Sequence, residues 1–157
     1  MSGHWDADIR QVQALEGGVV FAPIDVVAVG EAFDVAATAY VGEGLMAVVS
    51  YCDVFVAVRN LSRSVAVANA AVHHELVPVR RALHKTIRVK IDCGWAAVDG
   101  DVLEVLATFK VTAGVHTNYS LARSDPLIAC IRYSAPEPAQ FRGVLEEDTM
   151  PSGSRTR

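Results

Sequence analysis

The chain of 157 residues lacks the features that mark membrane and secreted proteins. It has no stretch of about 18 uncharged apolar residues, the minimum for a membrane-spanning helix. Its longest apolar stretches, 44–52 and 65–72, end at Asp53 and at His73. The N-terminus has no basic region followed by an apolar stretch, as a secretory signal would have. We therefore expect a cytoplasmic protein without a membrane span.

Cysteine is scarce, and the motifs of nucleotide-binding loops are missing. Cys52, Cys93 and Cys130 are an odd number at wide spacing, and no Cys-x-x-Cys pair occurs. This pattern predicts reduced, buried thiols and disfavours a disulfide framework. Neither Gly-x-x-x-x-Gly-Lys nor Gly-x-Gly-x-x-Gly occurs after a predicted strand, which disfavours nucleotide binding through a familiar loop. We expect no cofactor.

Charged and aromatic residues are also few, at 20% and 7% of the chain, and the net charge is -4. The one basic concentration lies between positions 80 and 90 and has no interleaved aromatic residues. It consists of Arg80, Arg81, His84, Lys85, Arg88 and Lys90. An acidic chain with such a segment is not expected to bind nucleic acid. The segment predicts a solvated face or a contact with an acidic protein segment such as 146–148.

Valine and alanine are abundant instead, with 25 and 23 copies in a chain that is 52% hydrophobic. Apolar residues alternate with polar ones over 33–41, 86–92 and 102–112, which predicts half-buried strands. Further strands are expected at 53–60 and 127–133, with weaker candidates at 18–22, 25–29 and 65–69. Turns rich in glycine, asparagine and aspartate separate these segments, as in an all-β sandwich or barrel.

Helical signals are confined to two short segments. Trp5, Ile9 and Val12 recur at helical spacing, so they predict a short N-terminal helix, with an initial strand as the alternative. The continuous apolar stretch 44–52 predicts one or two helical turns that bridge the sheets. We expect an N-terminal segment at 1–17, one β-domain at 18–134 and an extended C-terminal tail at 135–157, where proline and acidic residues increase.

Residues 95–105 resemble the loop and strand entry of immunoglobulin-like and fibronectin-type sandwiches, in which a glycine-containing corner leads into a long central strand. Residues 30–35 are similar to the start of an early strand in such domains. Leu103 stands where a corner tyrosine is expected, and no cysteine pair with an intervening tryptophan can be assigned. The resemblance implies an antiparallel immunoglobulin-like β-sandwich of about seven to eight strands, and no specific family or activity.

Potential metal ligands occur together only in pairs or short groups. Adjacent histidines on a strand point to opposite faces, so His73 and His74 cannot easily share an ion, and we expect a solvent-facing loop at 73–75. Asp99 and Asp101 flank a glycine, and Asp6 and Asp8 have the same spacing. A calcium site needs six or more oxygen ligands, so turn chemistry is the simpler interpretation. No metal site is predicted.

Catalytic residues are equally weakly indicated. His116, Ser120, Ser124 and Asp125 lie close together in the sequence, and Cys93 or Cys130 could pair with His84 or His116. None lies in a Gly-x-Ser-x-Gly elbow or another diagnostic context. A non-enzymatic role is therefore favoured. A hydrolase-type enzyme with a site centred on His116 is retained as an alternative.

The segment 53–60 is apolar on both faces, with Val54, Val56 and Val58 on one side and Phe55 on the other. A sandwich has one core, so the second face is expected to meet a partner or to be covered by 44–52 or the N-terminal segment. The predicted interface comprises Val54, Phe55, Val56, Val58, Arg80, Arg81, Arg88 and Lys90. The preferred function is a β-sandwich interaction or assembly module, a subunit of a homo-oligomer or larger complex. The alternative is a small-ligand or carbohydrate-binding module that uses Trp5, Trp95 and Tyr119.

Overall fold

A computed structural model describes residues 3–16 and 22–132. The fold is all-β, as predicted, and these residues form nine strands and one short helix. The elements are β1 (Ala7–Leu15), β2 (Val26–Ala28), β3 (Phe33–Val41), α1 (Glu43–Met46), β4 (Tyr51–Asn60), β5 (Val65–Glu75), β6 (Leu83–Ile91), β7 (Val102–Ala113), β8 (His116–Arg123) and β9 (Leu127–Cys130). In the described part no helix is long and apolar enough to cross a membrane.

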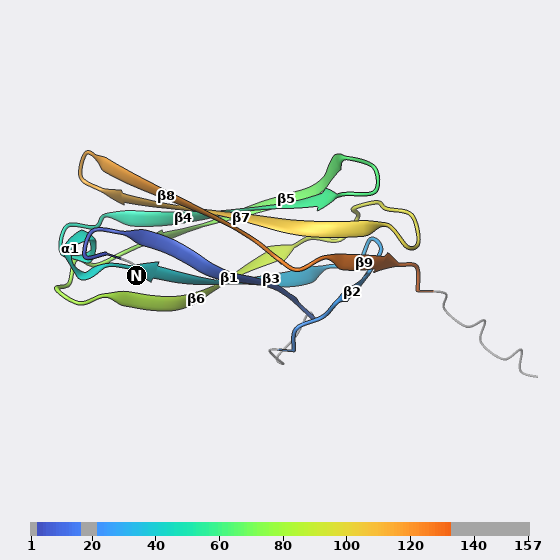
Figure 1. Cartoon of the computed structure of the whole chain (residues 1–157), viewed down its shortest axis with the longest axis horizontal. Helices are drawn as coiled ribbons and strands as arrows, with labels where there is room; N and C mark the ends of the chain where they lie inside the picture. The colour runs from blue at the N-terminus through green and yellow to red at the C-terminus, as the bar shows by residue number, and fades with distance from the viewer. Residues whose placement is uncertain (1–2, 17–21, 133–157) are drawn as a thin grey trace, which may run out of the picture.

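The strands form two sheets that lie face to face (Figure 1). One sheet has the order β1-β3-β6, and the other has the order β2-β9-β7-β4-β5 with β8 also paired to β7. All pairs are antiparallel except β2 with β9. The chain changes sheets after β1, β2, β3, β5 and β6. This Greek-key arrangement of two packed sheets confirms the immunoglobulin-like resemblance at the level of the fold.

The core lies between the sheets and is built from the alternation seen in the sequence. On β7 every second residue is fully or nearly fully buried, and the same holds for β3 and the middle of β4. The β-branched side chain of valine fits the pleated inner surfaces, and the small side chain of alanine fits where the two sheets pack closely. Val54, Val56 and Val58 face this core. They therefore fill the sandwich and are not available to a partner.

The N-terminal helix predicted from Trp5, Ile9 and Val12 is wrong and the alternative of an initial strand is confirmed, because residues 7–15 form strand β1 beside β3. The register of β1 shifts between Ile9 and Gln11. Such a bulge moves the alternation by one residue, so Ile9 and Val12 both face the core although they are three positions apart. The buried residues of a bulged strand can thus have the sequence spacing expected of a helix. The strand lies upstream of position 18, where the predicted β-domain begins.

The sequence also misplaced the end of β5 and missed β8. β5 runs from Val65 to Glu75, so the prediction of a loop at 73–75 is wrong. β8 has polar residues on both faces, and Ser120 bonds to β1 where an apolar residue would be expected. Of the helical turns predicted over 44–52, one is present as α1, while residues 51 and 52 begin β4. In α1 a Cβ on Gly44 would meet His4 and Trp5 at 2.5–2.9 Å. The candidate strand 18–22 and the tail lie largely or wholly outside the described residues.

Candidate interaction surface

The outer face of the larger sheet carries an apolar band across its middle. Alternation along β4 turns Phe55 and Ala57 outward, and the register places them beside Thr108 and Leu106 of β7. Ala71 of β5 and Leu121 of β8 continue the band to either side. Phe55 is 45% exposed and Leu121 is 58% exposed. We call these six residues the outer band.

The outer band is hollowed into a shallow groove. The groove has a volume of about 520 Å³, and its lining includes Phe55, Ala57, Leu106 and Leu121. The guanidinium-bearing residues Arg59 and Arg123 and the amide of Asn69 complete its rim. An apolar floor with a polar rim is the general composition of a protein–protein contact surface.

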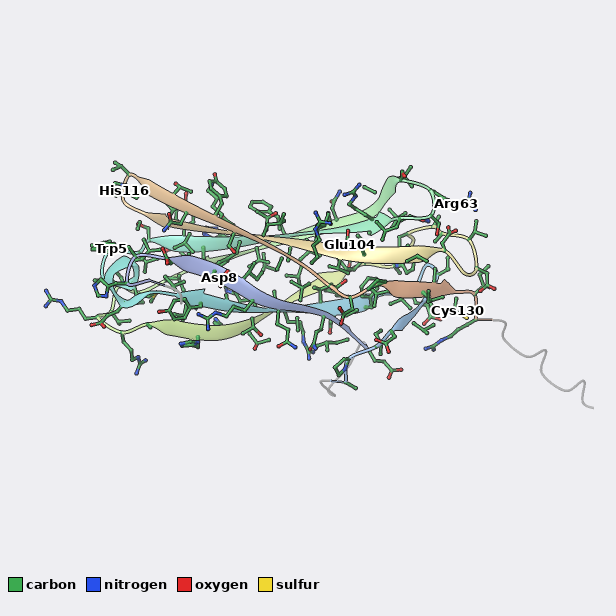
Figure 2. All side chains as sticks on the ribbon, viewed as in Figure 1. Trp5, Asp8, Arg63, Glu104, His116 and Cys130 are labelled. Atoms are coloured by element: carbon green, nitrogen blue, oxygen red, sulfur yellow. The ribbon has the colours of Figure 1, made fainter. Side chains whose placement is uncertain are left out.

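Charged residues flank the band at both ends. At one end Asp53 lies opposite Lys110, and at the other end Arg59 lies opposite Glu104. Glu104 is labelled in Figure 2. Asp53 Oδ1 lies 2.6 Å from His73 Nδ1, and Glu104 Oε1 lies 3.7 Å from Arg123 Nη1. The side chains of Lys110 and Arg59 make no ion pair within the described residues. Both cations can therefore bind acceptors beyond the described residues.

The outer face of the smaller sheet is polar by contrast. Thr38 lies opposite Thr86 there, and Arg88 Nη1 lies 3.2 Å from Asp34 Oδ2. Tyr40 contacts the ring of His84 at a centroid distance of 4.8 Å. The two outer faces of the described sandwich therefore differ in kind, and the apolar one belongs to the larger sheet.

The residues predicted as an interface do not form one surface. Phe55 lies on the outer band, whereas the three valines of β4 are in the core. Arg80 and Arg81 are exposed and precede β6. Arg88 and Lys90 share a face of β6, as predicted, but on the smaller sheet. The sequence could not separate these places because it does not show which sheet each strand joins.

The His116-centred catalytic arrangement is not brought together. His116 begins β8, and Ser120 lies four residues further, about 13 Å along the strand. The Ser120 hydroxyl donates to Asp8 Oδ1 and accepts from the Ile9 amide, while the Ser124 hydroxyl accepts from the Val105 amide. Figure 2 shows His116 and Cys130 at opposite ends of the molecule. These hydroxyls hold strands together.

The three aromatic residues considered for ligand binding lie in different places. Trp95 is buried against Phe33, and its Nε1 donates to the Glu31 carbonyl at 2.8 Å. Trp5 lies at the end of the sandwich beside a pocket of about 330 Å³ that also involves His116. Tyr119 projects from the outer face of β8. They do not form a single platform for a flat ligand.

Asp101, in the turn 99–101, is held by hydrogen bonds within the fold, and the three cysteines differ in burial. One oxygen of Asp101 accepts from the side chains of Asn60 and Arg63 and from the Val98 amide. These bonds lower the Asp101 pKa, the Val98 bond most of all. No group of three potential metal ligands occurs among the described residues. Burial raises the pKa of Cys52 to about 11, whereas Cys93 is exposed, so the prediction of buried thiols fails for Cys93.

The pair of His73 and Asp53 predicts a pH dependence. The hydrogen bond to Asp53 raises the His73 pKa, and the negative charges of Asp53 and Glu75 add to this effect. Because the folded pKa exceeds the unfolded value of about 6.5, this stabilisation is complete below about pH 6.5. It is lost as the pH rises through the folded pKa. In Asp53→Asn we expect the titration midpoint of the His73 ring, measured by NMR, to move to lower pH. An unchanged midpoint would contradict the pairing.

Comparisons with known proteins identify no family for this chain. No protein-family model matches the chain, and no curated protein is significantly similar to it. Among solved structures, a cross-linked bacterial adhesin from Mobiluncus mulieris aligns with 82% of this chain and 58% of its own at 12% identity and a TM-score of 0.47. A CARDB domain from Pyrococcus furiosus aligns with 84% of this chain and 100% of its own, at 12% identity and a TM-score of 0.43. A glycosyl hydrolase family 2 member from Bacteroides cellulosilyticus aligns with 75% of this chain and 15% of its own, at 6% identity and a TM-score of 0.43. The chain thus spans about one seventh of that hydrolase and less than two thirds of the adhesin.

Proposed function

We propose that this protein is a non-enzymatic β-sandwich interaction module that docks a protein partner on the outer band. The observation that carries the proposal is the difference between the two outer faces, because only the larger sheet presents contiguous apolar side chains among the described residues. Exposed apolar patches of this kind mark contact surfaces in soluble proteins. Covering Phe55 and Leu121 removes apolar area from water, which favours association.

Two hydroxyls and one thiol considered for a hydrolase are engaged elsewhere or far from His116. Ser120 and Ser124 have strand-linking hydrogen bonds, and Cys130 lies at the opposite end of the molecule from His116 (Figure 2). A nucleophile needs an adjacent base and an accessible position. These surroundings support a binding role over a catalytic one.

Site-specific cross-linking in the source cells tests the proposal. A photoreactive phenylalanine analogue that replaces Leu121 is expected to yield a discrete cross-linked species, because this position lies on the outer band. The same analogue at Thr86, exposed on the polar face of the smaller sheet, is the matched control and should yield none. Adding Phe55→Asp to the Leu121 variant should abolish the species. The absence of any species from Leu121, or equal labelling from both positions, would overturn the proposal.

A further inference from the structure

Four charged residues on the outer face of the larger sheet form a rectangle around one residue pair. Val56 and Ala107 are register partners on β4 and β7. Asp53 and Arg59 lie three residues before and after Val56, and Lys110 and Glu104 lie three residues after and before Ala107. Register pairs Asp53 with Lys110 and Arg59 with Glu104. Opposite charges therefore occupy adjacent corners, and like charges occupy the diagonals.

This arrangement is complementary to itself. A half-turn about an axis in the plane of the face, either across or along the strands, brings each corner of one copy over an adjacent corner of the other. Across the strands, Asp53 meets Arg59 of the second copy and Lys110 meets its Glu104. Along the strands, Asp53 meets Lys110 instead. In both cases every acid faces a base, as an isologous contact requires.

The apolar residues inside the rectangle follow the same symmetry. With the axis across the strands, Phe55 lies over Ala57 of the second copy. With the axis along the strands, it lies over Thr108, and Leu106 lies over Ala57. The large ring faces a small side chain in either case, which favours close packing. Lys110 and Arg59, which make no ion pair within the described part, meet Asp53 and Glu104 of the second copy. These two acids also lie beside His73 and Arg123 of their own copy.

We infer that the partner of the outer band is a second copy of this chain, bound face to face about a two-fold axis. This inference rests on the proposed function and names its partner. The face between residues 51 and 59 spans four strands about 4.8 Å apart, with a rise of about 3.3 Å per residue. Two such faces bury on the order of 1,200 Å² in total, the lower limit of standard interfaces. We expect dissociation constants in the micromolar range.

Sedimentation equilibrium of the full chain between about 1 and 500 µM tests self-association. Wild type is expected to form dimers, and Asp53→Lys and Arg59→Glu are each expected to weaken them about tenfold or more, since each change occurs twice in a dimer. Lys90→Glu, on the opposite sheet, is the matched control and should leave the constant unchanged. A thermal melt of each variant confirms that it is folded. A wild type that is monomeric at 500 µM would overturn the inference.

Mixing the variants identifies the axis and separates contacts between copies from those within one copy. An equimolar mixture of Asp53→Lys and Arg59→Glu restores both ion pairs of the axis across the strands, so its affinity should return to within about threefold of wild type. A mixture of Asp53→Lys and Lys110→Glu restores the axis along the strands in the same way. Restoration in one mixture supports the inference, and restoration in neither overturns it. If the chain is monomeric while Leu121 cross-links to another protein, the proposed function stands and the second copy is excluded.

Discussion

Replacing Phe109 with alanine is expected to destabilise the fold by about 3–5 kcal/mol, the usual effect of truncating a fully buried phenylalanine. Phe109 is 0% exposed and points from β7 into the core between the sheets. Its loss leaves a cavity whose lining residues cannot collapse, because the strands around it are fixed by their hydrogen bonds. Urea unfolding of the variant and wild type measures the difference in unfolding free energy.

Phe55→Ala is the matched control, because Phe55 lies on the neighbouring strand but points to the opposite face. Its ring is nearly half exposed, so we expect a loss of about 1 kcal/mol or less. The same variant should weaken docking at the outer band. Equal destabilisation by the two substitutions would mean that the outer band is covered in the folded protein, which would contradict its availability to a partner.

The alternation of apolar residues predicted most of the core. It placed strands at 33–41 and 102–112, where β3 and β7 lie within one residue of these bounds. In these segments one face meets the other sheet and one meets solvent, so burial and sequence have the same period of two. A period that survives along a whole strand identifies both the strand and its inner face.

Where the strand departs from this period, the sequence misleads. The register shift in β1 gives Ile9 and Val12 a helical spacing, and polar Asn118 and Ser120 on β8 hide a strand. A polar residue suits position 120 because the Ser120 hydroxyl links β8 to β1 through two hydrogen bonds. Such links join residues more than a hundred positions apart, so no local pattern indicates them.

The apolar content of β4 illustrates which part of the site was predictable. The sequence showed that both faces of 53–60 are apolar, but not which face meets the core. The fold assigns the valines to the core and Phe55 to the surface. The charged rectangle requires the register of β4 against β7, a contact between strands separated by two others in the chain. Surface patterns of this kind arise from sheet order, and sheet order is a property of the whole topology.

Asp101→Asn is expected to lower the melting temperature by roughly 5–10 °C, because it removes the acceptor of a buried hydrogen-bond network. Asp101 is 7% exposed. Its Oδ2 lies 2.6 Å from Asn60 Nδ2, 2.9 Å from Arg63 Nε and 2.9 Å from the Val98 amide. These bonds tie the turn after β4 to the loop before β7. An asparagine oriented with its amide nitrogen there would face three donors.

The pH dependence of the same substitution separates charge from shape. The hydrogen bonds from Val98 and Asn60, together with the bond and charge of Arg63, hold the Asp101 pKa below its ordinary value. A lowered folded pKa contributes stability that is complete above the unfolded pKa of about 3.9 and lost as the pH falls through the folded value. Acid titration of stability should therefore be shallower in Asp101→Asn than in wild type below about pH 4. Asp99→Asn is the control, because Asp99 accepts one bond from the exposed Ile131 amide, and it should melt within a few degrees of wild type. Identical acid profiles for wild type and Asp101→Asn would show that the network does not depend on the charge of Asp101.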